Sequence, residues 1–417
     1  MRSTGMTLRV AVAGGGLGGL CLAQHLAAAG IDVVVYERDP SLDSRGQGYR
    51  IHLDARAGRA LAASLPAGLY DLFARTCGQP STGLTVLSER LRTLHTEPAT
   101  IGPANPYAPG TLSTSANRRT LRQILACGLG ERIRFGRQVT GYDQDADEVR
   151  IRFADGTQEP ADLLVAADGV GSCIRRQYLP EADLVDSGSR CIYGRTPADR
   201  PTLASLPDSF RTGFTAVVGN QVGMAAAPLL FRMPPERAAA ESGLDITLAS
   251  VGDYMMWAVA AQRERWPVTD DEFDGLSPEH LHGTALAMIR KWHPSLRALV
   301  EQAVAEECFL ARIQHSTPVA AWPSSRVTVL GDAIHAMSPA RGSGGNTALR
   351  DAAELGRRLV AVASGEEKLL AAVGDYETVM REYGYEAIRV SAESERTTVA
   401  RRTGVMFWLV NHLPQKR

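Results

Sequence analysis

The stretch LRVAVAGGGLGGLCLAQHLAAAGIDVVVYERD, residues 8–39, decides the fold of this 417-residue chain. The apolar run 10–13 predicts a short buried strand, a glycine-rich turn follows it, and the Ala- and Leu-rich segment 20–29 predicts a helix. A second apolar run over 32–36 ends at Glu37. Strand, turn, helix, strand and acidic residue in this order are typical of a Rossmann-type βαβ unit, so we predict an α/β fold with a dinucleotide site.

The glycines of the turn have the spacing G-x-G-x-x-G, at Gly14, Gly16 and Gly19. Gly14 permits the tight turn, Gly16 lets a pyrophosphate approach the backbone, and Gly19 lets the helix pack closely on the sheet. The helix N-terminus offers unpaired N–H groups and a partial positive charge to the phosphates, while Glu37 is placed to accept from a ribose. The cofactor-binding residues predicted from this unit are Gly14, Gly16, Leu17, Gly19, Glu37 and Arg38.

Composition and charge narrow the possible partners. A formal net charge of -1 and a pI of about 6.8 give no global field toward nucleic acid or anionic lipid, which favours a small-molecule substrate. The six cysteines are scattered without metal-ligand spacing, which indicates reduced thiols in a cytoplasm and no metal site. The apolar run VMFWLV, residues 405–410, is much shorter than the about 20 residues of a membrane span, so we expect it to pack a terminal helix.

Two later strand patterns also end in acidic residues. LLVAADGVGS, residues 163–172, is an apolar strand that closes on Asp168 and Gly169. By itself this pattern favours an Asx-type turn, which Asp-Gly pairs form routinely. RVTVLGD, residues 326–332, repeats the arrangement and ends at Asp332. Because ligands of open α/β sheets lie beyond the carboxyl ends of the strands, Asp332 is placed to accept hydrogen bonds from a polyol.

Taken in order, the glycine turn with Glu37, the pair Asp168-Gly169 and the stretch GDAIHAMSPARGSGGNTALRDA, residues 331–352, resemble the flavin-dependent aromatic hydroxylases. This is the single-component monooxygenase family typified by p-hydroxybenzoate hydroxylase and the tetracycline-modifying monooxygenases. The resemblance covers almost the whole chain. It implies a discontinuous Rossmann-type FAD-binding domain, a sheet-based substrate domain and C-terminal helices.

The resemblance also implies roles for particular residues. In that family the glycine turn and its acidic partner bind the ADP half of FAD, which here are Gly14, Gly16, Gly19 and Glu37. The Asp-Gly segment serves both FAD and NAD(P)H, and this role falls on Asp168. The Gly-Asp aspartate holds the ribityl chain, and this role falls on Asp332. The pattern Arg-x-x-Leu in SANRRTLRQIL, residues 115–125, makes Arg118 the flavin-contacting arginine.

The loop after Asp332 has a physical role in this picture. We expect Pro339 to turn the chain beneath the flavin ring and the glycines of 342–345 to let the backbone approach it without Cβ interference. A helix beginning near Asn346 then directs its positive end, and the N–H groups of Gly344, Gly345 and Asn346, at the flavin. Family members commonly have Gly-x-Gly followed closely by Asn; this loop reads GSGGN, and Asn346 is its best match to that asparagine.

Two arginines and two histidines leave alternatives open. Arg45 and Arg50 follow the second strand, where an arginine binds either the phosphate of a nicotinamide cofactor or only solvent, and we include Arg45 among the cofactor-binding residues. We expect His335 to hydrogen-bond the backbone rather than to act as a base, and His52 to be structural. No catalytic side chain is assigned, because the flavin carries the chemistry.

The sequence also suggests a division into domains. We expect an FAD-binding domain of residues 1–76, 112–176 and 316–363, a substrate domain of residues 77–111 and 177–315, and a C-terminal helical segment over 364–417. Strand-like stretches over 215–229 and 253–259 predict a sheet that roofs the flavin. In YMMWAV, residues 254–259, alternation places Tyr254, Met256 and Ala258 on one face, without showing which face meets the substrate.

The activity implied by the resemblance is that of an NAD(P)H-driven monooxygenase, with NADPH favoured. In such an enzyme FAD is reduced, reacts with O2 to a C4a-hydroperoxide and transfers one oxygen atom to an aromatic or polyketide-like small molecule; hydroxylation leads, while epoxidation and Baeyer-Villiger insertion stay open. The alternatives are a flavin-dependent reductase, a non-catalytic flavoprotein and a halogenase. Against the halogenase, the Trp-x-Trp-x-Ile-Pro signature is absent and no lysine precedes Lys291. We expect a monomer or homodimer.

Overall fold

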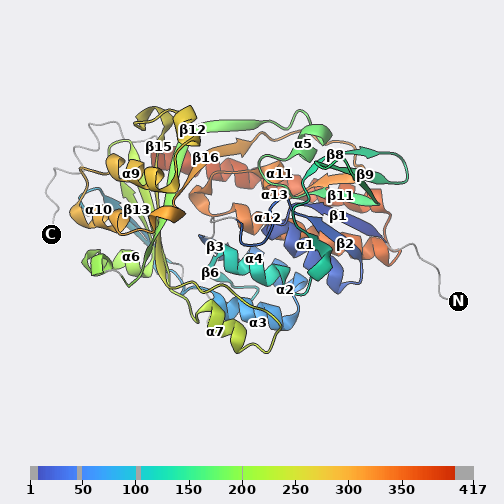
Figure 1. Ribbon diagram of the computed structural model, residues 1–417, viewed down its shortest axis with the longest axis horizontal. Coiled ribbons are helices and arrows are strands. Elements are labelled where there is room, and N and C mark those ends of the chain that lie inside the picture. Colours follow the sequence, from blue (N-terminus) through green and yellow to red (C-terminus); the bar gives the residue numbers. More distant parts are fainter. Residues whose placement is uncertain (1–7, 45–48, 100–104, 200, 400–417) are drawn as a thin grey trace.

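The computed structural model describes residues 8–44, 49–99, 105–199 and 201–399. A parallel sheet with its helices lies on one side of the molecule in Figure 1, and a larger sheet with shorter helices lies on the other. The expected α/β class, with a discontinuous FAD-binding domain and C-terminal helices, is confirmed. Arg45 and the run 405–410 lie outside the described residues, so the structure says nothing of either. Within the described ranges, no helix is both long and apolar enough to cross a membrane.

The parallel sheet has the strand order β17-β11-β1-β2-β7. Its strands are nearly continuous apolar runs, as expected for a parallel sheet that other elements cover. Helix α1 (Leu17–Ala28) packs against β1 and β2, and an antiparallel sheet of order β10-β9-β8 contacts β1 and β11. The bounds of these strands are β1 (Arg9–Ala13), β2 (Asp32–Tyr36), β7 (Ile133–Arg134), β8 (Val139–Gln144), β9 (Val149–Phe153), β10 (Gln158–Ala161), β11 (Leu163–Ala166) and β17 (Val327–Val329).

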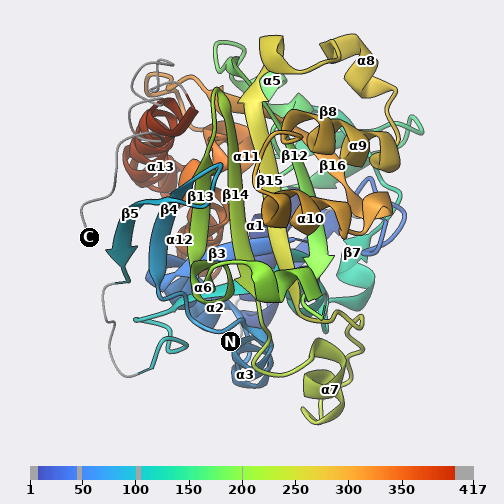
Figure 2. The same ribbon diagram turned by 90° about the vertical axis from the view of Figure 1, so that its left-hand side faces the viewer.

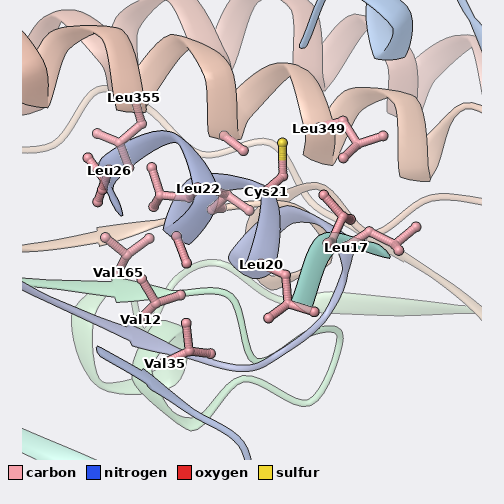
Figure 3. Close-up of a cluster of buried hydrophobic side chains, with 14 of the residues drawn as sticks. Val12, Leu17, Leu20, Cys21, Leu22, Leu26, Val35, Val165, Leu349 and Leu355 are labelled. Carbon is pink, nitrogen blue, oxygen red and sulfur yellow. The ribbon is translucent and has the colours of Figure 1, made fainter. Parts of the chain in front are cut away.

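Helix α1 (Leu17–Ala28) lies between this sheet and α12 (Gly344–Ala363), as Figure 3 shows. Leu20, Leu22 and Leu26 have no exposed surface, and the buried side chains of this helix contact the sheet on one side and α12 on the other. The remaining helices of this part are α2 (Ala55–Ser64), α3 (Ala67–Thr76), α4 (Arg118–Ala126), α5 (Cys173–Tyr178), α11 (Asp332–His335) and α13 (Leu369–Val399). Because α12 packs on α1, the stretch 331–352 is held against the glycine turn.

The larger sheet has the order β16-β12-β15-β14-β13-β4-β5. Figure 2 looks onto its outer face, where α6, α9 and α10 lie in front of the strands. The bounds are β4 (Gly83–Ser88), β5 (Thr93–Pro98), β12 (Leu184–Pro197), β13 (Phe214–Val218), β14 (Val222–Leu229), β15 (Tyr254–Gln262), β16 (Phe309–Ser316), α6 (Asp208–Thr212), α7 (Pro235–Ala240), α8 (Asp270–Asp274), α9 (Pro278–Met288) and α10 (Pro294–Glu301). The expected strands over 215–229 form a hairpin, β13 and β14.

The two faces of β15, which carry alternate residues of YMMWAV, have different surroundings. Met255 and Trp257 pack in one core cluster with residues of α9 and α10. Tyr254 and Met256 belong to a second cluster that includes Tyr49, which precedes β3 (Arg50–Asp54). Strand β3 pairs with β6 (Ser113–Asn117) in a two-stranded ribbon between the two sheets (Figure 1). The face that carries Tyr254 therefore looks toward the parallel-sheet part.

Candidate functional site

A cavity of about 440 Å³ opens at the carboxyl ends of β1, β2 and β11. This is the edge at which open α/β sheets bind ligands. Segments far apart in the sequence meet in its wall: the glycine turn, the end of β2, the start of α4 and the Asp-Gly segment. The predicted cofactor-binding residues that line it are Gly14, Gly16, Glu37, Arg38, Arg118 and Asp168.

The glycines of the turn meet three different surroundings. At Gly14, where φ is +111°, a Cβ would come within 2.3 Å of the carbonyl oxygen of Ala167, and at Gly19 a Cβ would lie 2.2 Å from the carbonyl oxygen of Gly14. These two glycines are required by the fold itself. At Gly16 a Cβ would meet no atom within 4 Å. The chain therefore leaves space at Gly16, next to the N-terminus of α1, where a pyrophosphate would lie.

Glu37 is buried, and the chain itself uses its carboxylate. Oε2 accepts from the Gly15 backbone N–H (2.9 Å) and from Arg122 Nη2 (3.1 Å), while Oε1 accepts from the Asp39 N–H (2.9 Å). Arg122 also donates to the carbonyl oxygens of Gly15 (2.7 Å) and Leu42 (3.0 Å). Glu37 and Arg122 thus hold the glycine turn and the end of β2 together; binding of a ribose by Glu37 stays a prediction.

Arg122 is a site residue that the sequence reasoning missed. It lies one turn after Arg118 in α4, so a signal was present: side chains at positions i and i+4 share a helix face. The cavity is rich in such charges, since six arginines line it against the two carboxylates of Glu37 and Asp168. The arginines are Arg38, Arg118, Arg119, Arg122, Arg137 and Arg176. This excess of guanidinium groups suits a diphosphate.

Only one of the two carboxylate oxygens of Asp168 accepts a hydrogen bond from the described chain. Its Oδ2 accepts from the Cys173 N–H (3.1 Å) at the start of α5. Its Oδ1 is buried and has no hydrogen-bond partner in the part of the chain that the structure describes. Burial raises the pKa of this carboxyl above its usual value. An unpartnered carboxylate oxygen in a cavity wall is available to a ligand donor such as a sugar hydroxyl.

Asp332 begins α11, directly after Gly331, whose φ is +65°. Its side chain is exposed, and its carboxylate accepts no hydrogen bond from any described residue. The surrounding protein atoms nevertheless partly desolvate the carboxyl group, and this raises its pKa. The charges of His335 and Arg118 act to lower the same pKa, by less. Arg118 therefore links the cavity to the Asp332 end of the site. An open carboxylate at a strand end is what binding of a polyol chain requires.

A buried cluster holds this short helix in place. Asp351 in α12 accepts from the Gly331 N–H (2.8 Å), His335 Nε2 lies 2.6 Å from the same carboxylate, and the Tyr383 hydroxyl donates to its other oxygen (2.5 Å). Burial alone would lower the pKa of His335, but the Asp351 carboxylate raises it. His335 therefore bonds a side chain and not the backbone as we expected, and its side chain has no exposed surface. It helps to position Asp332.

The glycine loop differs in detail from the expectation. Pro339 begins a 3-10 turn, Pro339–Arg341, and α12 begins at Gly344, two residues before the expected start near Asn346. Gly344 and Gly345 thus form the first helical turn, whose N–H groups have no acceptor within the helix. A Cβ on Gly345 would lie 3.9 Å from Leu17 Cδ1, and one on Gly344 would lie 3.7 Å from Asp332 Oδ1. The loop is therefore adjacent to both the fingerprint and Asp332.

The Asn346 side chain bonds to the β3–β6 ribbon. Its Nδ2 donates to the carbonyl oxygens of His52 and Gly342 (both 2.9 Å), and its Oδ1 accepts from the Asp54 N–H (2.9 Å). The side chain is fully engaged, so only its backbone N–H is left for a flavin contact. Arg50 is not the solvated loop arginine we considered, because it lies in β3 and its Nε donates to the Pro228 carbonyl oxygen (3.0 Å).

Comparison with known proteins shows the family to which this chain belongs. A family model described as an FAD binding domain matches residues 7–183 and 299–383, more than half of the chain. The chain therefore belongs to this FAD-binding family, whose members similar to this chain are FAD-dependent monooxygenases. It is similar to the dual O-methyltransferase/FAD-dependent monooxygenase elcB of Phaeosphaeria nodorum, with 36% identity over 88% of this chain and 42% of that protein. The chain thus spans less than half the length of that relative.

Two solved structures extend the comparison. A protein from Photorhabdus luminescens, assigned as an FAD-containing monooxygenase, has a TM-score of 0.79 at 32% identity over 94% of this chain and 98% of its own. The tetracycline destructase Tet(51) has a TM-score of 0.65 at 17% identity, over 99% of this chain and 100% of its own. At that identity the second likeness shows a shared fold. The expected family resemblance is confirmed.

Proposed function

We propose that this chain is an NAD(P)H-dependent monooxygenase, with NADPH favoured, that inserts one oxygen atom from O2 into an aromatic or polyketide-like small molecule. The observation that carries the proposal is the cavity in which the glycine turn, the start of α4 and the Asp-Gly segment meet. Asp332, on which the charge of Arg118 in the cavity wall acts, is exposed and accepts no hydrogen bond from the described chain. When bound there, FAD supplies the redox and oxygen-transfer chemistry.

The residues present fit FAD in charge and in space. The open position at Gly16 and the arginines of the cavity suit the pyrophosphate, and the free Oδ1 of Asp168 suits a hydroxyl donor. Asp332 would accept from the ribityl hydroxyls. The N–H groups of Gly344 and Gly345 would donate to the pyrimidine side of the ring, where a helix N-terminus stabilises negative charge by about 0.3 to 2 kcal/mol.

The face of the large sheet that carries Tyr254 and Met256 would roof the flavin and exclude water from the substrate. We retain the domain division at 76, 112, 176, 316 and 363, a cytoplasmic location, and a monomer or homodimer as proposals. In the overall reaction two electrons from NAD(P)H reduce O2, one oxygen atom enters the substrate, and the other leaves as water.

Product analysis under 18O2 tests this function. A panel of phenols and aromatic polyketides is incubated with the FAD-loaded protein, NADPH and 18O2. We expect a substrate that accelerates NADPH oxidation and yields a product heavier by one 18O atom. NADPH oxidation that yields a product without added oxygen would indicate a reductase. Tight ligand binding without any NADPH oxidation would indicate a non-catalytic flavoprotein.

A further inference from the structure

The β3–β6 ribbon lies between the parallel-sheet part and the large sheet (Figure 1). Its strands alternate: Ile51 and Leu53 pack against the larger hydrophobic core, so Arg50 and its cross-strand partner Asn117 share the other face. Both side chains reach the large sheet. Arg50 Nε donates to the Pro228 carbonyl oxygen (3.0 Å), and Asn117 Nδ2 donates to the Tyr254 hydroxyl (3.1 Å). This face of the ribbon is therefore polar.

Arg50 is a cation whose one hydrogen-bonded partner among the described residues is neutral. No carboxylate of the described chain forms an ion pair with it, and the segments outside the described ranges contain no Asp or Glu. Its pKa is lowered by burial to about 10, so the group remains charged at neutral pH. Arg195, whose guanidinium lies over the Tyr254 ring, by contrast pairs with Glu307. A partly buried charge without a counterion is costly, which points to an anion that arrives with a ligand.

The large sheet supplies aromatic surface beside this charge. The rings of Tyr49 and Phe309 stack with centroids 5.0 Å apart, and the rings of Phe309 and Tyr193 stack at 5.1 Å. Phe309 and Tyr193 keep partial exposure, whereas Tyr49 is buried. Tyr49 directly precedes Arg50 in the chain, and Tyr254 belongs to the same hydrophobic cluster as Tyr49. The charge of Arg50 acts to lower the pKa of Tyr254, although burial raises this pKa by more. The surroundings of Arg50 thus suit a flat aromatic ligand.

The same strand is fastened to the glycine loop. Asn346 bonds to the His52 carbonyl oxygen and to the Asp54 N–H, and a Cβ on Gly342 would lie 3.4 Å from the His52 Cβ. Arg50 and His52 are two residues apart on one strand face, a separation of about 7 Å. Arg50 therefore lies beside the loop that we assign to the flavin ring, on the side toward the large sheet.

We propose that Arg50 anchors an anionic oxygen of the substrate, so that the enzyme selects aromatic compounds bearing a phenolate, enolate or carboxylate. This inference rests on the proposed function, because it takes the space beside the glycine loop as the place of oxygen transfer. The two terminal nitrogens of Arg50 can donate to such a group in parallel. Ionised phenols and enolates are also the electron-rich forms that accept an electrophilic oxygen atom.

Calorimetric titration of the FAD-loaded protein without NADPH tests the inference. The probes are 1-hydroxy-2-naphthoate, which is anionic, and the methyl ester of its methyl ether, which is neutral and similar in shape. We expect the anionic probe to bind at least tenfold more tightly. Arg50→Gln should reduce this preference to less than threefold, Arg50→Lys should leave an intermediate preference, and Arg59→Gln, which removes an exposed positive charge in α2, should keep it.

Other outcomes would overturn the proposal. No preference for the anionic probe in the unaltered protein, or no binding of that probe up to its solubility limit, contradicts the substrate class. A preference unchanged in Arg50→Gln, together with weaker FAD binding or a raised KM for NADPH, would assign Arg50 to a cofactor instead. Far-ultraviolet circular dichroism and FAD content identify a variant that misfolds, and Arg50→Lys then decides. Because the titration needs no turnover, it stays informative if the monooxygenase proposal itself fails.

Discussion

Glu37 and Asp332 are both acidic residues at the carboxyl end of a strand, but their carboxylates differ in how many hydrogen bonds they accept from the chain. Glu37 is buried, and Gly15, Asp39 and Arg122 donate to its carboxylate. Asp332 is exposed and accepts no hydrogen bond from the described residues, while Asp168 is intermediate, with one oxygen bonded and one free. The three carboxylates form a series from fully used to fully open.

The difference separates two kinds of site residue. A carboxylate whose hydrogen bonds go to its own chain builds the shape of the site, and its loss should lower stability. A carboxylate that accepts no hydrogen bond from its own chain is available to a ligand, and its loss should lower the affinity for that ligand. The same distinction divides the glycines, because Gly14 is filled around by backbone whereas Gly16 faces free space.

Gly14→Ala should have the largest effect. The added Cβ would come within 2.3 Å of the Ala167 carbonyl oxygen, at a φ of +111° that alanine rarely adopts. Overpacking against backbone and the strained conformation together should lower the free energy of unfolding by about 3 kcal/mol or more. Gly16→Ala is the matched control: thermal unfolding of the apoprotein should change little while FAD binding weakens. Equal loss of stability in both variants would contradict the division.

Glu37→Gln should lower the stability of the protein even when no ligand is bound. It leaves Arg122, whose side chain is 11% exposed, without its carboxylate. Loss of this charged hydrogen bond should lower the free energy of unfolding of the apoprotein by about 2 kcal/mol, measured by urea denaturation. Unchanged stability combined with weaker FAD binding would show that Glu37 acts on the ribose alone.

Asp332→Asn should give the reverse result. Each hydrogen bond to a charged acceptor contributes about 1.5 to 3 kcal/mol, so the FAD dissociation constant should rise at least tenfold, as measured by titration of the apoprotein. The stability of the apoprotein should stay the same, since no described residue bonds to this carboxylate. Asp271→Asn, an exposed change in α8, serves as the control. A large loss of stability would make Asp332 structural, like Glu37.

Gly345→Ala should have the smallest effect, with opposite signs on two properties. A Cβ at this position would meet its nearest atom, Leu17 Cδ1, at 3.9 Å, so alanine should raise the stability of the apoprotein by about 0.5 to 1 kcal/mol through helix propensity. If the flavin ring approaches this backbone, FAD affinity should fall in the same variant. Gly283→Ala in α9 should stabilise without affecting FAD. Stabilisation by Gly345→Ala with unaltered FAD binding would leave the glycine a helix residue only.

The sequence predicts the positions of these residues well but not their bonding. The strand over 32–36 is confirmed, and the glycine turn, Glu37, Arg118 and Asp168 meet in one cavity as expected from their motifs. Motif spacing carries this information because the backbone of a βαβ unit fixes where its ends lie. Two of the partners of Glu37, however, are Gly15 in the glycine turn and Arg122 in α4, which lie 22 and 85 positions away in the chain, so the residues around Glu37 do not record these bonds.

The inter-sheet region was the least predictable. From the sequence, Arg50 could either bind the phosphate of a nicotinamide cofactor or lie in a solvated loop. In the structure it is a strand residue that donates to the carbonyl oxygen of Pro228, 178 positions later in the chain. The face of YMMWAV was also open, because alternation gives two faces without saying which other element covers each. Both depend on how two sheets pack, which periodicity along one strand does not report.

The most direct test of the central claim is identification of the nucleotide that the purified protein carries. The account predicts a yellow protein that releases noncovalent FAD on heating, with one FAD bound per chain after reconstitution, as measured by chromatography and absorbance. Recovery of NAD alone, or of no nucleotide from protein prepared with added FAD, would contradict the assignment of the cavity and Asp332 to one FAD site.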